Sequence, residues 1–529
     1  MTSFLFESIS QLHSLVNDPQ PRAGLHPIPG SRPLTFGAAI LPPLIYYFAL
    51  LLLAPPPPPA IDSVYVKTLR NILALTAGVL FFRLPLVYHV PQSIGLTYQL
   101  GLFGLYGGCR VMDAFFISLY LFHHVPRRVN YVHPRLESPA SGRITKDWSN
   151  GGVKEFYPPR ESKIVHDTPE PETSQNNNRR RSSLSTFARR MSDTIPDAAR
   201  TSCLAVQHTL AGPSPRPVLE TASTESGWPQ SFRDRAAWAL ELELSMRGVG
   251  FTWTTADVRH TRKTQSPTIG DRIHSVFVHA LPVLLANWFI IKSIYVRYFV
   301  TPPNSPFSPT QPLPNEAQSH ELFDTALPLP IQLLLTCALG AFLMAVFSLE
   351  HSLFAILLSP LAPSPLAFFP PLYSRRIWNV RSVRGFWSYG WHRLFARLFL
   401  VYGVWPGEWV ERKLTGKRAG EPADVGKILG GFLASAFVHA FSVRGVLGGD
   451  WASAAGEARF FALNGVAVVV EEMAGKAVRK ARKERGVPQR MWYDGWVGRM
   501  WWITVLLGLG RNFARGWVKS GLVREIALQ

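Results

Sequence analysis

Long blocks of apolar residues constrain this chain more than any other feature. A helix that crosses a bilayer needs about 20 mostly apolar residues, and several stretches reach that length. Only 17% of the 529 residues are charged, against about 25% in soluble globular proteins. The sequence therefore predicts an all-α polytopic membrane protein with about seven to nine transmembrane helices. The candidate spans are Leu34–Ala54, Thr68–Val90, Leu96–Phe122, Val276–Phe299, Ala326–Leu361, Ile428–Leu447, Phe460–Ala474 and Val497–Leu509, with a shorter interfacial segment at Leu394–Trp409.

A long polar segment divides these spans into two groups. We expect N-terminal transmembrane helices in residues 1–125, a cytosolic insert in 126–270, a membrane core in 271–511 and a tail in 512–529. The insert carries an excess of Lys and Arg, as cytosolic loops do. Its part from Pro169 to Ser231 is rich in Pro, Ser, Thr, Asn and Arg. Such a composition buries too little apolar surface to fold, so we expect disorder around residues 169–231.

The net charge of +20 raises nucleic acid as a partner. The basic residues lie mainly between the apolar blocks, however, where membrane topology explains them. We therefore expect the lipid bilayer, and no nucleic acid, as a partner. The three cysteines, Cys109, Cys203 and Cys337, are scattered along the chain. They form neither a disulfide framework nor a metal motif, so no metal site is predicted.

Ionisable residues inside apolar spans are costly and mark candidate functional sites. Arg110 and Asp113 are three residues apart on one expected helix, so we expect them to pair with each other. Glu471 and Glu472 lie at the cytosolic end of their span, where water can solvate them. His439 lies alone among small and aromatic residues in Gly431–Phe441. It suits either a general base near neutral pH or a structural hydrogen bond.

A second cluster combines arginines with aromatic residues beside a membrane span. It runs from Asn379 to Arg393 and holds Arg384, Phe386, Trp387, Trp391 and His392. Membrane interfaces favour aromatic belts with basic anchors. The same residues also suit a phosphorylated, planar ligand, because arginine binds phosphate and stacks on rings. Composition does not separate these two interpretations.

A resemblance favours the second interpretation. The segment Ser382–His392 resembles the S-x-R-x-F-W-x-x-x-W-H signature of the wax-synthase-like branch of membrane-bound O-acyltransferases. His439 follows 47 residues after His392 within an apolar helix, as in that family. Met246–Gly250 resembles the R-G-I-G element of fungal members, and Phe460–Glu471 resembles the helix that follows the family's active-site histidine. The chain departs at Ser388–Gly390, where members commonly carry G-R-R, so two positive charges are missing beside the implied site.

The resemblance implies a helical bundle that encloses a tunnel, in the endoplasmic reticulum membrane. It implies transfer of an acyl group from acyl-coenzyme A, with acetyl-coenzyme A favoured, to a hydroxyl of a lipophilic acceptor such as a fungal terpenoid or other secondary metabolite. No bound cofactor is expected. A long-chain alcohol wax-ester synthase and a non-enzymatic transporter or scaffold are the alternatives. The implied catalytic residues are His439 and His392, and the implied substrate-binding residues are Arg384, Phe386, Trp387, Trp391 and Asn379.

Overall fold

The chain forms two compact units, of which the larger holds every helix described below. The computed structural model describes residues 24–54, 63–128, 228–229, 231–249, 251–253, 268–300, 327–358, 369, 372–373, 377–418, 421–489 and 491–528. One unit comprises Met1–Asn130, Thr221–Thr415 and Ala423–Gln529, and the other comprises Tyr131–Glu220 and Gly416–Pro422. The expected disordered segment, 169–231, lies outside the described residues apart from residues 228, 229 and 231.

The regular structure of the described residues is helical, apart from two short parallel strands, β1 (Arg32–Pro33) and β2 (Tyr88–His89). The longer helices are α2 (Phe36–Leu51), α3 (Val64–Val87), α4 (Ile94–Met112), α7 (Phe232–Leu244), α10 (Leu281–Tyr298), α11 (Leu329–Leu357), α15 (Trp405–Thr415), α16 (Asp424–Arg444), α17 (Trp451–Glu484) and α18 (Asp494–Lys519). Shorter helical elements are η1 (Asp113–Leu121), α9 (Ile269–Ser275), η2 (Val276–Ala280), η4 (Ile377–Asn379), α13 (Val383–Gly385), η5 (Phe386–Gly390), α14 (Ala396–Phe399), η6 (Leu400–Val404) and α19 (Leu522–Leu528).

Six of the described helices are long and apolar enough to cross a bilayer. They are Val64–Val87, Ile94–Leu121, Ile269–Tyr298, Leu329–Leu357, Asp424–Arg444 and Trp451–Glu484. The first expected span corresponds to α2, whose 16 residues extend about 24 Å at 1.5 Å per residue. The last expected span lies within the more polar α18. The all-α polytopic membrane architecture is confirmed, whereas the enclosed tunnel remains a prediction.

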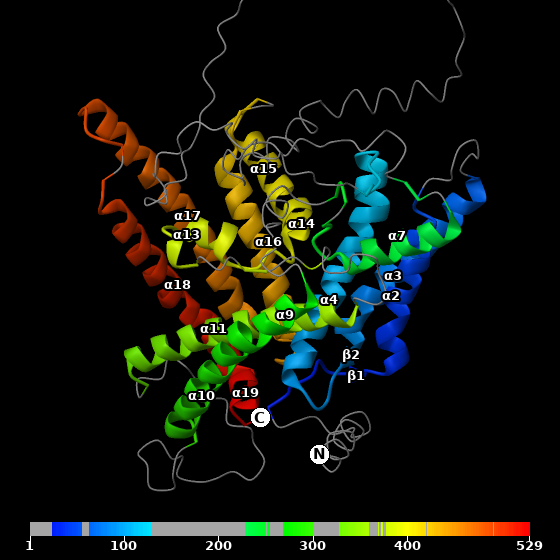
Figure 1. The fold of residues 1–529 in the computed structure, drawn as a ribbon, viewed down its shortest axis with the longest axis horizontal. Helices are drawn as coiled ribbons and strands as arrows, with labels where there is room; N and C mark the ends of the chain where they lie inside the picture. The colour runs from blue at the N-terminus through cyan, green and yellow to red at the C-terminus, as the bar shows by residue number, and fades with distance from the viewer. Residues whose placement is uncertain are drawn as a thin grey trace, which may run out of the picture. The chain divides into compact units, whose positions relative to one another are not determined.

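Helices α2, α3 and α4 lie side by side at the N-terminal end of the bundle (Figure 1). The contact between α3 and α4 is close because α4 presents glycines to bulky α3 side chains. A methyl group on Gly107 would overlap the ring of Phe81, and one on Gly104 would overlap Pro85. Small residues at a helix interface let two backbones approach in this way.

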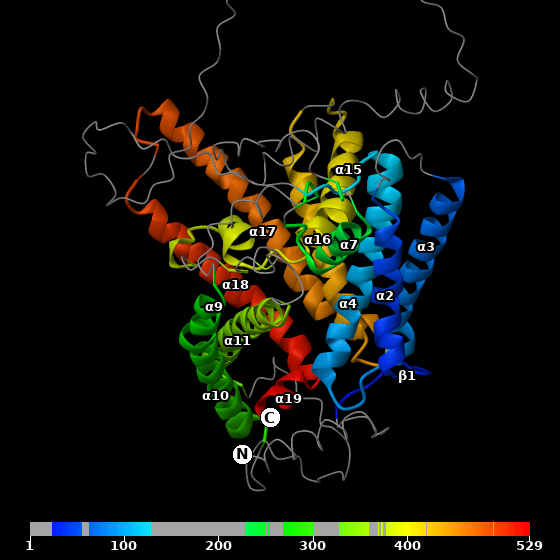
Figure 2. The same ribbon diagram turned by 45° about the vertical axis from the view of Figure 1, so that its right-hand side comes forward.

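Helix α16, which carries His439, packs between α17 and the segment η6–α15 (Figure 2). Four glycines form the contact with η6–α15: Gly403 faces Gly430, and Gly407 faces Gly426. A Cβ atom on any of them would overlap backbone atoms of the opposite helix. This crossing fixes the position of α16, and with it the position of His439, relative to the rest of the bundle.

Buried ion pairs and hydrogen bonds connect distant segments. The expected pairing of Arg110 with Asp113 is wrong. Asp113 accepts hydrogen bonds from Arg397, at 2.7 Å from Nε and 3.0 Å from Nη2. Arg110 instead donates to the hydroxyls of Tyr46 and Tyr106, at 3.1 and 2.6 Å. Both side chains project from α4 and η1 toward neighbouring elements, which offer better partners than the same helix does.

The C-terminal helix α19 is tied to the start of α4 by a buried carboxylate. Glu525 accepts hydrogen bonds from the backbone N–H groups of Ile94 and Gly95, at 2.7 and 3.1 Å, and from the hydroxyl of Ser93 at 2.7 Å. A carboxylate at a helix N-terminus satisfies otherwise unpaired N–H groups and complements the helix dipole. This contact anchors the C-terminal end of the chain on the N-terminal helices.

Candidate active site

His439 lies near the C-terminal end of α16 and is held by side chains from two other helices, α4 and α17. Its Nδ1 atom lies 2.9 Å from the hydroxyl of Tyr98 on α4 and 3.8 Å from Oε2 of Glu457 on α17. The ring of Phe461 stacks on the imidazole with the two centroids 4.2 Å apart. The His439 side chain keeps 14% of its exposure. The polar partners therefore hold one ring nitrogen, and the ring is not fully enclosed.

Glu457, which contacts both Tyr98 and His439, is a residue that sequence reasoning did not single out. Its side chain is completely buried and accepts hydrogen bonds from the hydroxyl of Tyr98, at 3.0 Å, and from the indole N–H of Trp517 on α18, at 2.9 Å. Glu457 lies in the second turn of α17, six residues after the helix begins at Trp451. Helical spacing could have found it, because the buried positions of α17 recur every three or four residues: Ala454, Glu457, Phe461, Asn464, Gly465 and Val468.

The signature segment Ser382–His392 folds into a short helix and a wider π-helical turn. The Ser382 hydroxyl accepts a hydrogen bond from the backbone N–H of Gly385, at 2.8 Å, which caps α13. The turn η5 follows, and the backbone becomes extended at Trp391. Single π-helical turns are frequent at functional sites. Here the change of direction places His392 directly after the turn.

Two glutamates of α17 hold this segment in place. Glu471 accepts hydrogen bonds from the backbone N–H groups of Val383 and Arg384, at 2.7 and 3.2 Å. Glu472 forms an ion pair with the guanidinium of Arg384, at 2.5 Å. The expectation that water solvates both glutamates is therefore wrong. They lie beneath the N-terminal end of α13, where carboxylates satisfy unpaired N–H groups.

An aromatic path connects His392 to His439. The ring of Trp391 lies 5.2 Å from that of His392 and 6.0 Å from that of Trp387, measured between centroids. The Trp387 ring lies 5.7 Å from that of Phe461, which stacks on His439. The structure thus brings together both predicted catalytic histidines and the two predicted tryptophans.

Trp387 is fixed by a buried amide. Its indole N–H donates to Oδ1 of Asn464 on α17, at 3.1 Å, and Asn464 is completely buried. Phe386, also predicted, is buried against Trp502 of α18 in a stacked arrangement. Asn379 is exposed at the end of η4, and Arg384 points to Glu472. Substrate contacts by Asn379 and Arg384 stay a prediction.

His392 lies in an apolar, aromatic environment. The rings of Phe347, Tyr373, Trp391 and Phe395 surround it at centroid distances from 5.1 to 6.3 Å. Burial, with a smaller contribution from the charge of Arg247, lowers the pKa of His392 to about 3. Its Nδ1 atom is shielded from solvent and has no hydrogen-bond partner among the described residues. At neutral pH His392 is therefore an uncharged imidazole.

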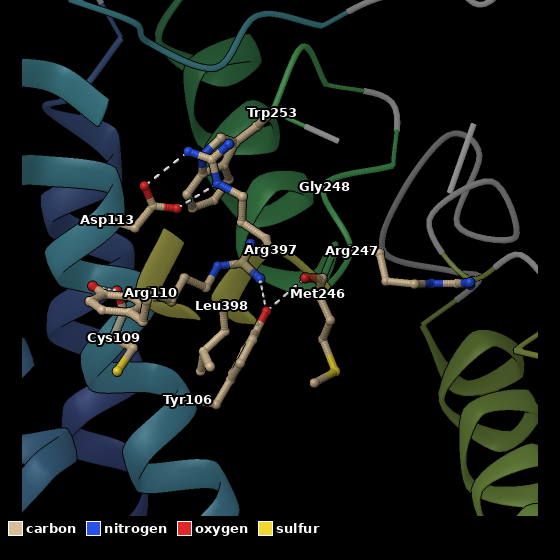
Figure 3. A pocket seen from close by; sticks show the side chains of 11 residues that line it. Tyr106, Cys109, Arg110, Asp113, Met246, Arg247, Gly248, Trp253, Arg397 and Leu398 are labelled. Carbon is tan, nitrogen blue, oxygen red and sulfur yellow. Dashed lines mark hydrogen bonds and ion pairs between the residues drawn. The ribbon is translucent and has the colours of Figure 1, made fainter. Parts of the chain in front are cut away.

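A pocket of about 340 Å³, part of it open to solvent, lies between η1, α14 and the segment that follows α7. The guanidiniums of Arg110 and Arg397 both lie over the ring of Trp253, at 5.2 and 5.4 Å from its centroid. Figure 3 shows Arg397 joined to Asp113 and Arg110 joined to Tyr106. The side chain of Arg247 points away from this cluster. Arg397 and Asp113 therefore pair with each other, and Arg110 is held by neutral groups of the protein.

Two comparisons with known proteins bear on this site, and a third finds nothing. The model of the membrane bound O-acyl transferase family matches residues 369–463, which include both histidines. Acetyltransferase eriL from Hericium erinaceus is 26% identical over 247 residues, 46% of this chain and 59% of the relative. Acetyltransferase ple2 from Rhodocybe pseudopiperita is 25% identical over 279 residues, 52% of this chain and 64% of the relative.

The chain thus matches about 60% of the length of these curated relatives. No solved structure matches it. The family match and the two relatives agree with the helical membrane fold. The part of the chain that holds both histidines, residues 369–463, is therefore similar to the membrane bound O-acyl transferase family.

Proposed function

We propose that the protein is an acyl-coenzyme A-dependent O-acyltransferase in which His439 is the general base. The observation that carries this proposal is the environment of His439. It is an imidazole held at Nδ1 by Tyr98, inside an apolar helix and within the part of the chain that matches the family. A positioned imidazole suits proton abstraction near neutral pH.

The reaction needs no nucleophile from the protein. His439 Nε2 takes the proton of the acceptor hydroxyl while the hydroxyl oxygen attacks the carbonyl carbon of the thioester. The carbon–sulfur bond then breaks, and the thiolate leaves with the proton that His439 returns. The products are an ester and free coenzyme A. A general base of this kind contributes about 10²–10⁴-fold to the rate.

His392 acts on the acyl group in this proposal. Its low pKa keeps the imidazole neutral, so it presents one N–H donor at neutral pH. A donor aimed at the thioester oxygen stabilises the negative charge that develops in the transition state. The aromatic path from Trp391 through Trp387 to Phe461 provides an apolar wall between the two histidines.

The proposed donor is acetyl-coenzyme A and the proposed acceptor is a lipophilic alcohol, such as a terpenoid, at the endoplasmic reticulum membrane. Both relatives are named acetyltransferases, which supports the donor. The aromatic surroundings of both histidines support an apolar acceptor. Membership of the wax-synthase-like branch is part of the proposal and rests on Ser382–His392.

The test measures free thiol released from acetyl- and palmitoyl-coenzyme A by membranes that contain wild type or His439→Ala. The acceptors are long-chain alcohols on one side and terpenoid alcohols on the other. We expect acceptor-dependent release by wild type, faster with acetyl-coenzyme A, and none by the variant. Equal release by both proteins would contradict the role of His439. Preference for palmitoyl-coenzyme A and long-chain alcohols would identify a wax-ester synthase instead.

A further inference from the structure

Three side chains from three helices form a hydrogen-bonded chain that ends at Nδ1 of His439, the ring nitrogen that takes no part in the proposed proton transfer. The hydroxyl of Tyr98 lies between His439 Nδ1, at 2.9 Å, and Glu457 Oε2, at 3.0 Å. The indole N–H of Trp517 donates to the other carboxylate oxygen of Glu457, at 2.9 Å. Tyr98 is 6% exposed and Glu457 is fully buried.

The number of protons in this chain of contacts determines the tautomer of His439. A phenol has one proton to donate, and a carboxylate in its ionised form accepts only. In the ionised state of Glu457, which the donors Tyr98 and Trp517 favour, Tyr98 donates to Glu457, and its oxygen accepts the remaining hydrogen bond from Nδ1–H of His439. The other ring nitrogen, Nε2, is then unprotonated and carries a lone pair. That is the form a general base requires.

We infer that Tyr98 and Glu457 are positioning residues that hold His439 in its base-competent tautomer. This inference rests on the proposed function. When His439 Nε2 takes the proton of the acceptor hydroxyl, the ring becomes an imidazolium. Glu457, with Oε2 3.8 Å from Nδ1, then supplies the opposite charge from a fully buried position. No proton moves to Glu457; the Nδ1–H bond and the Tyr98 O–H bond stay intact throughout.

The decisive substitution is Glu457→Gln, which keeps the size of the side chain and reverses the hydrogen bonds. With its carbonyl oxygen accepting from Trp517, the new amide N–H donates to the oxygen of Tyr98. Tyr98 must then donate to His439 Nδ1, which leaves the ring proton on Nε2. We expect kcat to fall about 10²–10⁴-fold with an unchanged KM for the acyl donor, because a wrong tautomer of this kind costs about 10⁴-fold in a serine protease triad.

Adding Tyr98→Phe to Glu457→Gln distinguishes positioning from mere structural support. Without the phenol, nothing holds the wrong tautomer, and Nδ1 and Nε2 compete freely for the proton. We expect the double variant to be about tenfold faster than Glu457→Gln, since one net hydrogen bond is worth about that factor. A structural role predicts the opposite, because two lost contacts destabilise more than one. Tyr98→Phe alone, which keeps the ring, should lower kcat about tenfold.

The matched control is Glu525→Gln. Glu525 is also a buried glutamate, 6% exposed, with three hydrogen bonds, but it lies at the start of α4 and not at His439. We expect this variant to keep the wild-type kcat per folded molecule, measured after size-exclusion chromatography in detergent.

The outcomes separate the two proposals. An active wild type, an inactive His439→Ala and a Glu457→Gln variant with wild-type kcat would overturn the positioning role and leave the proposed function standing. A double variant no faster than Glu457→Gln would also overturn it. Should Glu457→Gln not fold, an unchanged kcat in Tyr98→Phe would overturn it too. Wild type inactive with every donor and acceptor would overturn the proposed function itself.

Discussion

The pocket beside η1 and the surroundings of His439 are two buried polar clusters of the larger unit, and they differ in how completely their polar groups are hydrogen-bonded. In the pocket beside η1, Asp113 accepts from Arg397 and from the Ser118 hydroxyl, at 2.7 and 2.8 Å. Arg110 donates hydrogen bonds to two tyrosine hydroxyls and to the carbonyl oxygens of Leu242 and Ser245. Around His439, by contrast, the hydrogen bonds reach Nδ1 and leave Nε2 for another partner.

The difference teaches how to recognise the reactive cluster. A buried charge with all its partners in the protein holds segments together, and removing one partner leaves an expensive unpaired charge. An imidazole fixed through one nitrogen only is oriented and still able to exchange a proton. The pocket holds more charged side chains. The His439 cluster instead leaves one ring nitrogen, Nε2, without a hydrogen bond among the described residues. We therefore expect damage to the pocket to lower stability and damage at His439 to lower the reaction rate.

The largest expected effect on stability is that of Asp113→Ala. This change leaves the buried guanidinium of Arg397 without its carboxylate, which costs about 3–5 kcal/mol. The rate per folded molecule should stay that of wild type. Thermal unfolding in detergent measures the first quantity, and thiol release per folded molecule measures the second.

The control for that prediction is Asp234→Ala. Asp234 pairs with Arg128 at 2.6 Å, but its side chain is 37% exposed, so its loss should cost only about 0.2–1 kcal/mol. Equal losses of stability in the two variants would show that the pocket is not the structural cluster described here.

A smaller effect is expected from Trp387→Phe in the aromatic path. The change removes the donor to Asn464 Oδ1, and an unpaired buried acceptor costs about 1–3 kcal/mol. Trp391→Phe serves as the control, since the Trp391 indole has no hydrogen bond among the described residues. The melting temperature should fall further in Trp387→Phe. The reverse order would contradict the role assigned to the Trp387–Asn464 contact.

The smallest effect concerns pH and His392. Burial lowers its pKa from 6.5 to about 3 in the folded protein, whereas the unfolded chain takes up a proton below pH 6.5. The stability that the neutral ring contributes is complete above pH 6.5 and is lost as pH falls toward 3. Between pH 6.5 and 5.5, wild type should lose about 1 kcal/mol more than His392→Phe. Thermal unfolding at each pH measures the free energy of unfolding. Equal losses in the two proteins would show that His392 is solvated.

Much of the architecture could be predicted from the apolar blocks alone. Their positions located the membrane-spanning helices, although the ends differ by up to ten residues: 326–361 was expected against 329–357, 276–299 against 269–298, and 460–474 against 451–484. Helix α2 was expected at 34–54 and is shorter, at 36–51. Bilayer thickness imposes the length of a span, so hydropathy finds it without any knowledge of packing.

The partners of buried charges could not be predicted, because they come from segments distant in sequence. Asp113 meets Arg397 and not Arg110, and Tyr98 meets Glu457 across 359 residues. Spacing along one helix predicts only neighbours three or four residues away. The histidines were found because the motif around His392 and the isolation of His439 are both visible locally. Glu457 was missed because its importance depends on Tyr98 and Trp517.

The most direct test of the account is transfer of radiolabelled acetate from acetyl-coenzyme A to the alcohol that supports thiol release, by purified wild type and His439→Ala. Both proteins are compared at equal folded concentration, with Asp234→Ala as an unrelated surface variant. The account predicts labelled ester from wild type and from Asp234→Ala, and a rate lower by about 10²–10⁴-fold for His439→Ala. Labelled ester formed at the wild-type rate by His439→Ala would contradict it.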